Sequence, residues 1–323
     1  MKIFNQLLVG LLMGVCAQSA WSSEFKPSKP VTLIVPYGPG GGTDTVGRLF
    51  AQKLSAIWGQ PVVVDNRSGG DGSIGAAHVA RSKPDGTTLL LSVASIVINP
   101  YIMTQKLPYN TKTAFTPITT LARPVVVMIA SSGMQAKNVP EFISEARKKP
   151  GKFTFGSAET STRMYGERLK ESEKFDMQHI GYRGSSQWTI DLLNGLIDTG
   201  FMSITSAMPF LKDGKVKVLG VLSSRRSELL PNAPTLLEQG ISGLESHSWY
   251  GLFGPGKMPK ETVDAIYEDV KTVLTDPEVL NKLKFLGAEI GGDPPEEFNK
   301  RFQGDLVEYE AMIRRLHLNE TSQ

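Results

Sequence analysis

Along the first hundred residues, apolar positions alternate between unbroken runs and a helical period. Val31–Val35 is rich in β-branched residues, which predicts a buried strand, and apolar residues then recur at helical spacing over 46–57. Further strands at 61–64 and 87–93 flank a small-residue helix near 73–81. These two β–α–β units predict a parallel sheet with helices on both faces, because such crossovers are right-handed.

The same alternation restarts after Pro124 and continues to about residue 222. From Thr262 onward the pattern is helical, and such a segment needs a sheet to lie on, so we assign it to the first set of strands. The sequence therefore predicts an α/β fold of two doubly wound lobes with a cleft between them. Lobe 1 would comprise residues 24–123 plus 246–323, and lobe 2 residues 124–245.

Residues 1–23 have the pattern of a secretory signal peptide. Met1 and Lys2 precede an apolar run from Ile3 to Cys16 that is short for a membrane span, and the small residues after it fit a signal peptidase site. A retained N-terminal anchor helix is the alternative. Cys16 is the one cysteine of the chain and leaves with the signal, so we expect a mature protein without disulfides, thiolate metal sites or thiol nucleophiles.

Composition and charge exclude several classes of protein. The 323 residues are 40% hydrophobic and 21% charged, which is typical of globular proteins. Removing Lys2 from the 35 basic residues leaves 34 against 32 acidic ones, and no basic run is long enough to follow a nucleic-acid backbone. No later segment has the ~18 consecutive apolar residues that a membrane span needs. We expect no nucleic acid partner and no membrane insertion of the mature chain.

A glycine-rich loop between the first strand and the first helix is the strongest candidate site. Backbone N–H groups and the helix N-terminus converge there, so the loop suits an anion. The spacing fails the phosphate-loop and dinucleotide patterns in detail, and a carboxylate would be bound by the same physics with less charge. The alternative is a tight turn in which Thr43 or Asp44 only caps the helix. The candidate residues are Tyr37, Gly38, Pro39, Gly40, Gly41, Gly42, Thr43 and Asp44, with Ser92 and Ser95 near the end of the 87–93 strand.

Two more strand-to-helix loops lie in the second half of the chain. One combines small residues, hydroxyls and an arginine at a helix start: Gly156, Ser157, Ala158, Thr160, Ser161 and Arg163. Arg163 is able to hold a carboxylate through two parallel hydrogen bonds, although a solvent-facing arginine beside hydroxyl caps is an equal alternative. The other loop offers Tyr182 as an aromatic wall and Arg183 as a charge, and both are as easily surface residues.

Catalytic and metal-binding patterns are weak. The four histidines, at 78, 179, 247 and 317, lie far apart in sequence, and Asp71–Gly75 is only an incomplete nucleophile elbow. We therefore expect no metal, no cofactor and no enzymatic activity.

Taken in order, these loops resemble one family across the whole mature chain, the Bug-type extracytoplasmic solute receptors of tripartite tricarboxylate transporters. The resemblance rests on segments along both halves of the chain: Pro30–Asp44, Gln60–Arg67, Gly69–Gly75, Lys83–Gly86, Asn99–Pro100, Phe155–Ala158, Tyr182–Gly184, Leu230–Thr235, Glu238–Gly240 and Trp249–Gly251. It implies a periplasmic-binding-protein (Venus flytrap) fold with a hinge, in which the lobes close over a small carboxylate. It also implies a periplasmic location, integral-membrane permease subunits as partners, and a pocket built by the Tyr37–Asp44 and Gly156–Arg163 loops. We expect a monomer.

Several positions depart from the family pattern, as judged from the resemblance. Glu159 stands near a common glycine, Arg163 where histidine is frequent, and Met202 where an acidic residue is common. Together they suggest a ligand with a second carboxylate or a flat apolar body, such as an aromatic or longer dicarboxylate. We expect the hinge strands near Arg123–Pro124 and His247–Trp249. A periplasmic ligand-sensing module for a signalling partner is the alternative function.

Overall fold

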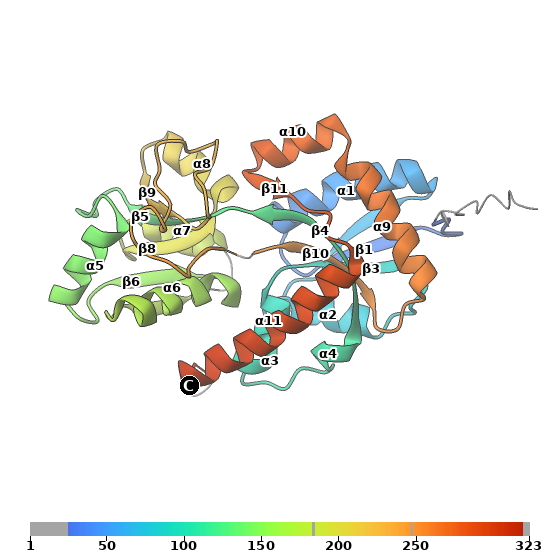
Figure 1. The fold of residues 1–323 in the computed structure, drawn as a ribbon, viewed down its shortest axis with the longest axis horizontal. Coiled ribbons are helices and arrows are strands. Elements are labelled where there is room, and N and C mark those ends of the chain that lie inside the picture. Colours follow the sequence, from blue (N-terminus) through green and yellow to red (C-terminus); the bar gives the residue numbers. More distant parts are fainter. Residues whose placement is uncertain (1–24, 183–184, 247, 319–323) are drawn as a thin grey trace, which may run out of the picture.

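The computed structural model describes residues 25–182, 185–246 and 248–318 (Figure 1). The expected signal peptide and Arg183 therefore lie outside the described residues. Two separate β-sheets, each covered by helices, form the two lobes of the molecule (Figure 1). This arrangement confirms the bilobed α/β fold that the sequence predicts.

The first sheet has six strands in the order β11-β4-β10-β3-β1-β2. Its two faces pack against different helices. Val31, Leu33 and Val35 pack with helices α1 and α9, while Ile34 and Leu90 pack with α2, α3 and the C-terminal helix α11. The strands are β1 (Val31–Val35), β2 (Val62–Asn66), β3 (Thr88–Ser92), β4 (Phe115–Pro124), β10 (Tyr250–Pro255) and β11 (Ala288–Ile290). The helices are α1 (Gly42–Trp58), α2 (Ser73–Ala80), α3 (Ser95–Ile102), α4 (Thr111–Ala114), α9 (Lys260–Leu274), α10 (Pro277–Phe285) and α11 (Pro295–Arg315).

The second sheet has five strands in the order β7-β6-β8-β5-β9. Met128 of β5 packs with α5 and α6 on one face, and Val127 and Ile129 pack with α7 and α8 on the other. The strands are β5 (Val126–Ser131), β6 (Thr154–Ser157), β7 (Gln178–Gly181), β8 (Thr199–Ser203) and β9 (Val216–Val221). The helices are α5 (Val139–Lys148), α6 (Thr160–Glu173), α7 (Ser185–Leu193) and α8 (Ile204–Lys212).

Both sheets are mixed, which differs from the expected parallel arrangement. β1 pairs in parallel with β2 and β3, as the two β–α–β units predict, but β10 runs antiparallel to β3 and β4. In the second sheet, β5 runs antiparallel to β8 and β9. Strands that return from the other sheet enter from the opposite end, and the apolar pattern of a strand does not encode its direction.

The sequence pattern also missed β4, α3 and α8. Each contains an internal proline, Pro117, Pro100 and Pro209 respectively, which argues locally against a strand or a helix. Tertiary packing overrides that signal, because Ile118, Ile98 and Ala207 of these elements are fully buried.

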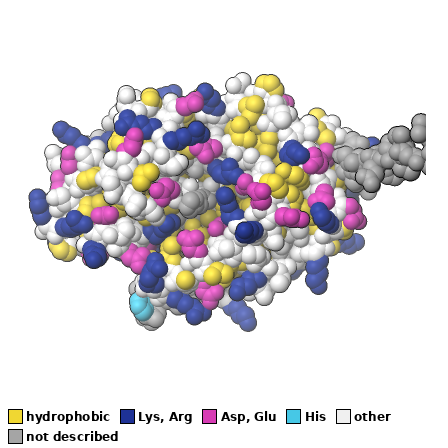
Figure 2. All heavy atoms as spheres, viewed as in Figure 1, with side chains coloured by type: hydrophobic (Ala, Val, Ile, Leu, Met, Phe, Trp, Pro, Cys, Tyr) yellow, Lys and Arg dark blue, Asp and Glu magenta, His cyan; other side chains and the backbone are white. Residues whose placement is uncertain are grey.

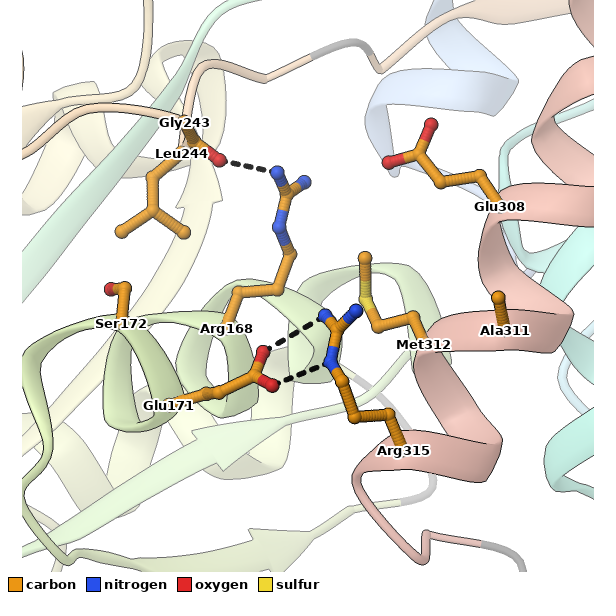
Figure 3. A pocket seen from close by; sticks show the side chains of 9 residues that line it. All are labelled: Arg168, Glu171, Ser172, Gly243, Leu244, Glu308, Ala311, Met312 and Arg315. Atoms are coloured by element: carbon orange, nitrogen blue, oxygen red, sulfur yellow. Dashed lines mark hydrogen bonds and ion pairs between the residues drawn. The ribbon is translucent and has the colours of Figure 1, made fainter.

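The chain passes between the two sheets directly from β4 to β5, and again just before β10 (Figure 1). A third connection is made by the end of α11, which reaches α6 of the other lobe. There the Arg315 guanidinium forms two hydrogen bonds with the Glu171 carboxylate, at 2.6 and 3.0 Å (Figure 3). The two lobes are thus tied on the outer surface, beside a hollow of about 300 Å³, as well as by the backbone.

On the face drawn in Figure 2, positive and negative side chains are interspersed over both lobes. Among the described helices, none has the combination of length and apolar character that a membrane span requires.

Candidate functional site

A cleft of about 1240 Å³ between the lobes is lined by residues from both sheets. The loop after β1, the glycine turn before α2 and the start of β10 come from the first lobe, and the start of α6 with parts of α7, β8 and α8 come from the second. Such a concave space with apolar walls and a few converging polar groups is the usual form of a ligand site. The apolar wall of the second lobe includes Ile190, Leu193, Met202 and Phe210.

The start of α1, beside this cleft, has backbone N–H groups without a helical acceptor. α1 begins at Gly42, and the cap residue Gly41 has no side chain to cap it. The first N–H that bonds within the helix is that of Thr45, to the Gly41 carbonyl at 2.9 Å. The N–H groups of Gly42, Thr43 and Asp44 therefore lack a helical acceptor, and they lie at the positive end of the α1 dipole. An anion placed there would be bound by the backbone alone.

Asp44 holds the loop in shape from behind and is almost completely buried, with 3% of its surface exposed. Its Oδ2 accepts hydrogen bonds from Gly40 N at 2.9 Å and Arg48 Nε at 3.0 Å, and its Oδ1 accepts one from Asn66 Nδ2 at 2.9 Å. Burial alone would raise the pKa of this carboxyl, but the hydrogen bonds from Arg48, Gly40 and Asn66 lower it below the usual range. The sequence left open whether Asp44 belongs to the binding loop or only caps the helix; Asp44 is not among the residues that line the cleft, and its hydrogen bonds hold the loop.

Two tyrosines close the cleft around the loop. A Cβ atom at Gly42 would lie 2.4 Å from the hydroxyl of Tyr250, so glycine is what lets α1 begin against β10. Tyr37 lies beside the glycine turn of the Gly69–Gly75 segment, and Asn66 fixes its carbonyl through a 3.0 Å hydrogen bond. Burial, followed by the charges of Asp71 and Glu159, raises the pKa of Tyr37 far above its usual value. Burial, and then the charge of Glu159, also raises the pKa of Tyr250, so both tyrosines are neutral near neutral pH.

The other side of the cleft is formed by the start of α6. Glu159, Ser161, Thr162 and Tyr165 line it, together with Ala158 from the preceding strand end. This end contacts the first lobe directly: Thr160 Oγ1 donates to Asp71 Oδ2 at 2.6 Å, and Ser95 and Ser161 hydroxyls lie 3.4 Å apart. Burial, and then the charge of Asp71, raises the pKa of Glu159 to about 7. Burial also raises the pKa of Asp71.

The structure places most, but not all, of the expected residues on the cleft. Those that line it are Tyr37, Gly38, Pro39, Gly40, Gly41, Gly42, Thr43, Ala158, Ser161, Tyr182 and Met202. Those that do not are Asp44, Ser92, Ser95, Gly156, Ser157, Thr160 and Arg163. Tyr182 also donates a hydrogen bond to Asp191 at 2.7 Å, and burial with the Asp191 contact raises its pKa to about 12.

Arg163 and Ser157 have other partners. The Arg163 guanidinium points along its own helix and meets Glu167 Oε1 at 3.3 Å. Ser157 lies 2.7 Å from His179 Nε2, and burial, with the charges of Arg163 and Lys170, lowers the pKa of that histidine to about 3. Gly156 packs against Ile197 and Trp188 in the core.

Several lining residues were not singled out from the sequence as site residues. The most important is Asp71, whose backbone has a φ of 45°, a left-handed conformation that is uncommon outside glycine, asparagine and aspartate. The sequence signal that could have identified Asp71 is a charged residue inside the glycine-rich Gly69–Gly75 turn. The others include Thr45, Tyr165, Ser203, Ser206, Phe210, Ser248 and Tyr250, which only the folded arrangement brings to the cleft.

Comparison with known proteins agrees with this architecture. The family model described as "Tripartite tricarboxylate transporter family receptor" matches residues 46–318. A protein from Pseudomonas sp. (strain P51), named "UPF0065 protein in tcbD-tcbE intergenic region", is 31% identical over 98% of this chain and 95% of its own.

Two solved structures are similar along nearly the whole fold. The periplasmic binding protein BugD has a TM-score of 0.81 at 29% identity, covering 90% of this chain and 99% of its own. The protein Rpa4515 of R. palustris, solved with adipate, has a TM-score of 0.84 at 29% identity, covering 90% of this chain and 98% of its own. The chain therefore belongs to the tripartite tricarboxylate transporter receptor family, as a Bug-type receptor.

Proposed function

We propose that this protein is a periplasmic solute receptor that captures a small carboxylate and delivers it to the membrane permease of a tripartite transporter. The observation that carries the proposal is the set of N–H groups at Gly42, Thr43 and Asp44, which lack a helical acceptor at the positive end of α1 beside the cleft. The adipate-bound structure of the R. palustris relative supports the ligand class.

Lobe closure is the mechanism we infer for capture. Residues of both lobes line the cleft, so a ligand that touches both favours the closed state over the open one. We place lobe 1 at residues 24–123 plus 246–323 and lobe 2 at 124–245, with the hinge where the chain passes between the sheets. A ligand with equal affinity for both states would shift nothing, so contacts with α6 or α7 are as necessary as those with α1.

The geometry gives no support to a second carboxylate held by Arg163. That side chain is only 18% exposed and is paired with Glu167 outside the cleft lining. The apolar wall formed by Ile190, Leu193, Met202 and Phe210 instead supports an aliphatic or aromatic body attached to the carboxylate.

A thermal-shift screen of the mature protein against mono-, di- and tricarboxylates, aromatic acids and amino acids tests the proposal. A ligand present at 100 times its dissociation constant should add about 2.7 kcal/mol to the free energy of unfolding, which raises Tm by several degrees. A saturable shift confined to carboxylates is the expected result. If protein refolded from denaturant shows no shift with any of these compounds, and mass spectrometry finds no co-purified acid, the receptor function is refuted.

A further inference from the structure

One face of helix α6, which belongs to the second lobe, lies against the first lobe. Thr160, Met164 and Glu171 are spaced so that they fall within about 40° of one another around the helix axis. Thr160 bonds to Asp71 of the glycine turn, and Met164 is buried in a hydrophobic cluster of the first lobe. At the other end of the helix, Glu171 pairs with Arg315 of α11 (Figure 3). We call this contact of α6 with the glycine turn, α3 and α11 the α6 seam.

The polar end of the α6 seam lies at the edge of the cleft. Asp71 Oδ2 accepts hydrogen bonds from Thr160 N at 2.9 Å and from Thr160 Oγ1 at 2.6 Å. The same hydroxyl lies 2.9 Å from Asn99 Oδ1, and Asn99 Nδ2 donates to the Asp71 carbonyl at 2.8 Å. The Ser95 hydroxyl hydrogen bonds to Asp71 and lies 3.4 Å from the Ser161 hydroxyl. Such polar contacts are typical of interfaces between domains that move relative to one another.

The centre of the α6 seam is apolar. Met164 is 1% exposed and lies in the same hydrophobic cluster as Ile98 of α3 and Met312 of α11. Full burial of a methionine side chain favours the joined state by about tenfold to 150-fold. Leu169 lies about 140° further around the helix and is buried in the core of the second lobe. Helix α6 therefore has one buried face in each lobe.

We propose that the α6 seam is a latch for lobe closure: its contacts form when the lobes close, break when they open, and favour the closed state whichever acid is bound. The inference rests on the proposed function, because it assumes that capture proceeds by lobe closure. Asp71 and Ser161 both line the cleft, from opposite lobes, so lobes that separate there break the seam. A latch raises the population of the closed state before any acid binds, which lowers the apparent Kd of all acids by a common factor.

A cysteine placed in the seam reports its opening. The one cysteine of the chain, Cys16, lies in the expected signal peptide, so we expect the mature protein to contain no other thiol. Met164→Cys places a thiol in the seam. Leu169→Cys, on another side of the same helix and in the core of one lobe, is the matched control. A buried thiol reacts with the disulfide reagent DTNB only when the structure opens around it.

The measurement is the rate of DTNB labelling of each variant in native buffer, compared with the rate that its own free energy of unfolding in urea allows. For Leu169→Cys the two rates should agree, because only unfolding exposes that thiol. For Met164→Cys, labelling should be faster than unfolding allows by about tenfold or more. Labelling of Met164→Cys at the unfolding-limited rate would overturn the inference, because the seam would then stay joined in the native protein. An equal excess in both variants would overturn it as well, since α6 itself would then be unfolding.

A cross-link tests whether the seam has to open for an acid to enter. The Ser95 and Ser161 hydroxyls are 3.4 Å apart, so the sulfur atoms of Ser95→Cys/Ser161→Cys need only a small side-chain rotation to reach the ~2.0 Å of a disulfide. The reduced form of the same protein is the control. The probe is adipate, or the acid with the largest saturable Tm shift in the thermal-shift screen.

In stopped-flow measurements, oxidation should slow both association and dissociation of the probe by about tenfold or more, and reduction should restore both rates. Equal rates in the two forms would overturn the latch. If no acid binds the wild type, the proposed function fails, whereas the labelling rates still decide whether the seam opens.

Discussion

Removing a single backbone donor at the start of α1 gives the most specific prediction for ligand binding. Proline lacks an N–H, and the first position of a helix is where a helix tolerates it best. Gly42 occupies that position, and the preceding Gly41 has φ −75° and ψ 170°, an extended conformation that a residue before proline favours. Gly42→Pro should therefore delete one donor while α1 still forms.

The new side chain needs one compensating change. Any Cβ at residue 42 would lie 2.4 Å from the Tyr250 hydroxyl, but 3.4 Å from the ring carbon that carries it. Tyr250→Phe removes that oxygen and turns the clash into ordinary contact. The comparison is thus between Gly42→Pro/Tyr250→Phe and Gly42→Ala/Tyr250→Phe, which share the added Cβ; in the proline variant the ring carbon Cδ takes the place of the amide hydrogen.

The expected change in Kd follows from the charge of the acceptor. A hydrogen bond from an N–H to a carboxylate contributes about 1.5–3 kcal/mol, which corresponds to about tenfold to 150-fold in Kd. Titration calorimetry with the tightest-binding acid from the thermal-shift screen should show this ratio between the Kd values of the two double variants. Their Tm values should be similar in the absence of ligand. Equal Kd values in the two proteins would refute the assignment of the carboxylate to the start of α1.

Two further substitutions and one double-mutant cycle test the electrostatics of the cleft and of the contact between the lobes. Asp44→Ala removes the acceptor that the Gly40 N–H and the Asn66 amide share at this carboxylate and should lower the free energy of unfolding in urea by about 1–3 kcal/mol; a loss within experimental error would contradict its structural role. Glu159, facing Asp71, has a folded-state pKa of about 7, raised from 4.5, so its contribution to stability is present below about pH 4.5 and is lost as pH rises through 7. The Tm of ligand-free Glu159→Gln should therefore rise relative to that of the wild type between about pH 5 and pH 8. A constant difference between the two Tm values over this range would contradict the raised pKa of Glu159. The Arg315–Glu171 pair, with side chains 59% and 34% exposed, should show a coupling of about 0.2–1 kcal/mol in a double-mutant cycle of ligand affinity, weakening with salt; zero coupling at low salt would mean that it does not favour closure.

The elements that set the positive end of the cleft were predictable from local sequence. Val31–Val35, the glycines after it and the periodic helix follow one another without interruption, so strand, loop and helix N-terminus were all expected. The role of Asn66 was not predictable. Asn66 lies on a neighbouring strand and bonds to Asp44 and Tyr37, and only the parallel pairing of β1 with β2 brings it there.

The contact between Asp71 and the start of α6 depends on segments that are far apart in the sequence. Asp71 and Thr160 are 89 residues apart, and their hydrogen bonds exist only because two lobes face each other. Arg163 illustrates the opposite case: its sequence position beside a helix start suggested an anion ligand, but helical geometry places Glu167 one turn away, within reach of the guanidinium. Local patterns therefore predicted the loop and the helix start at α1, whereas the contact between Asp71 and the start of α6 required the folded arrangement.

The most direct test of carboxylate binding at the start of α1 is a crystal structure of the mature protein with the tightest-binding acid from the thermal-shift screen. The account predicts a ligand carboxylate oxygen at about 2.9 Å from the backbone nitrogens at the start of α1, with the apolar body against Met202 and Phe210. A carboxylate bound instead at Arg163, or at the start of α6 in place of Asp71, would contradict it.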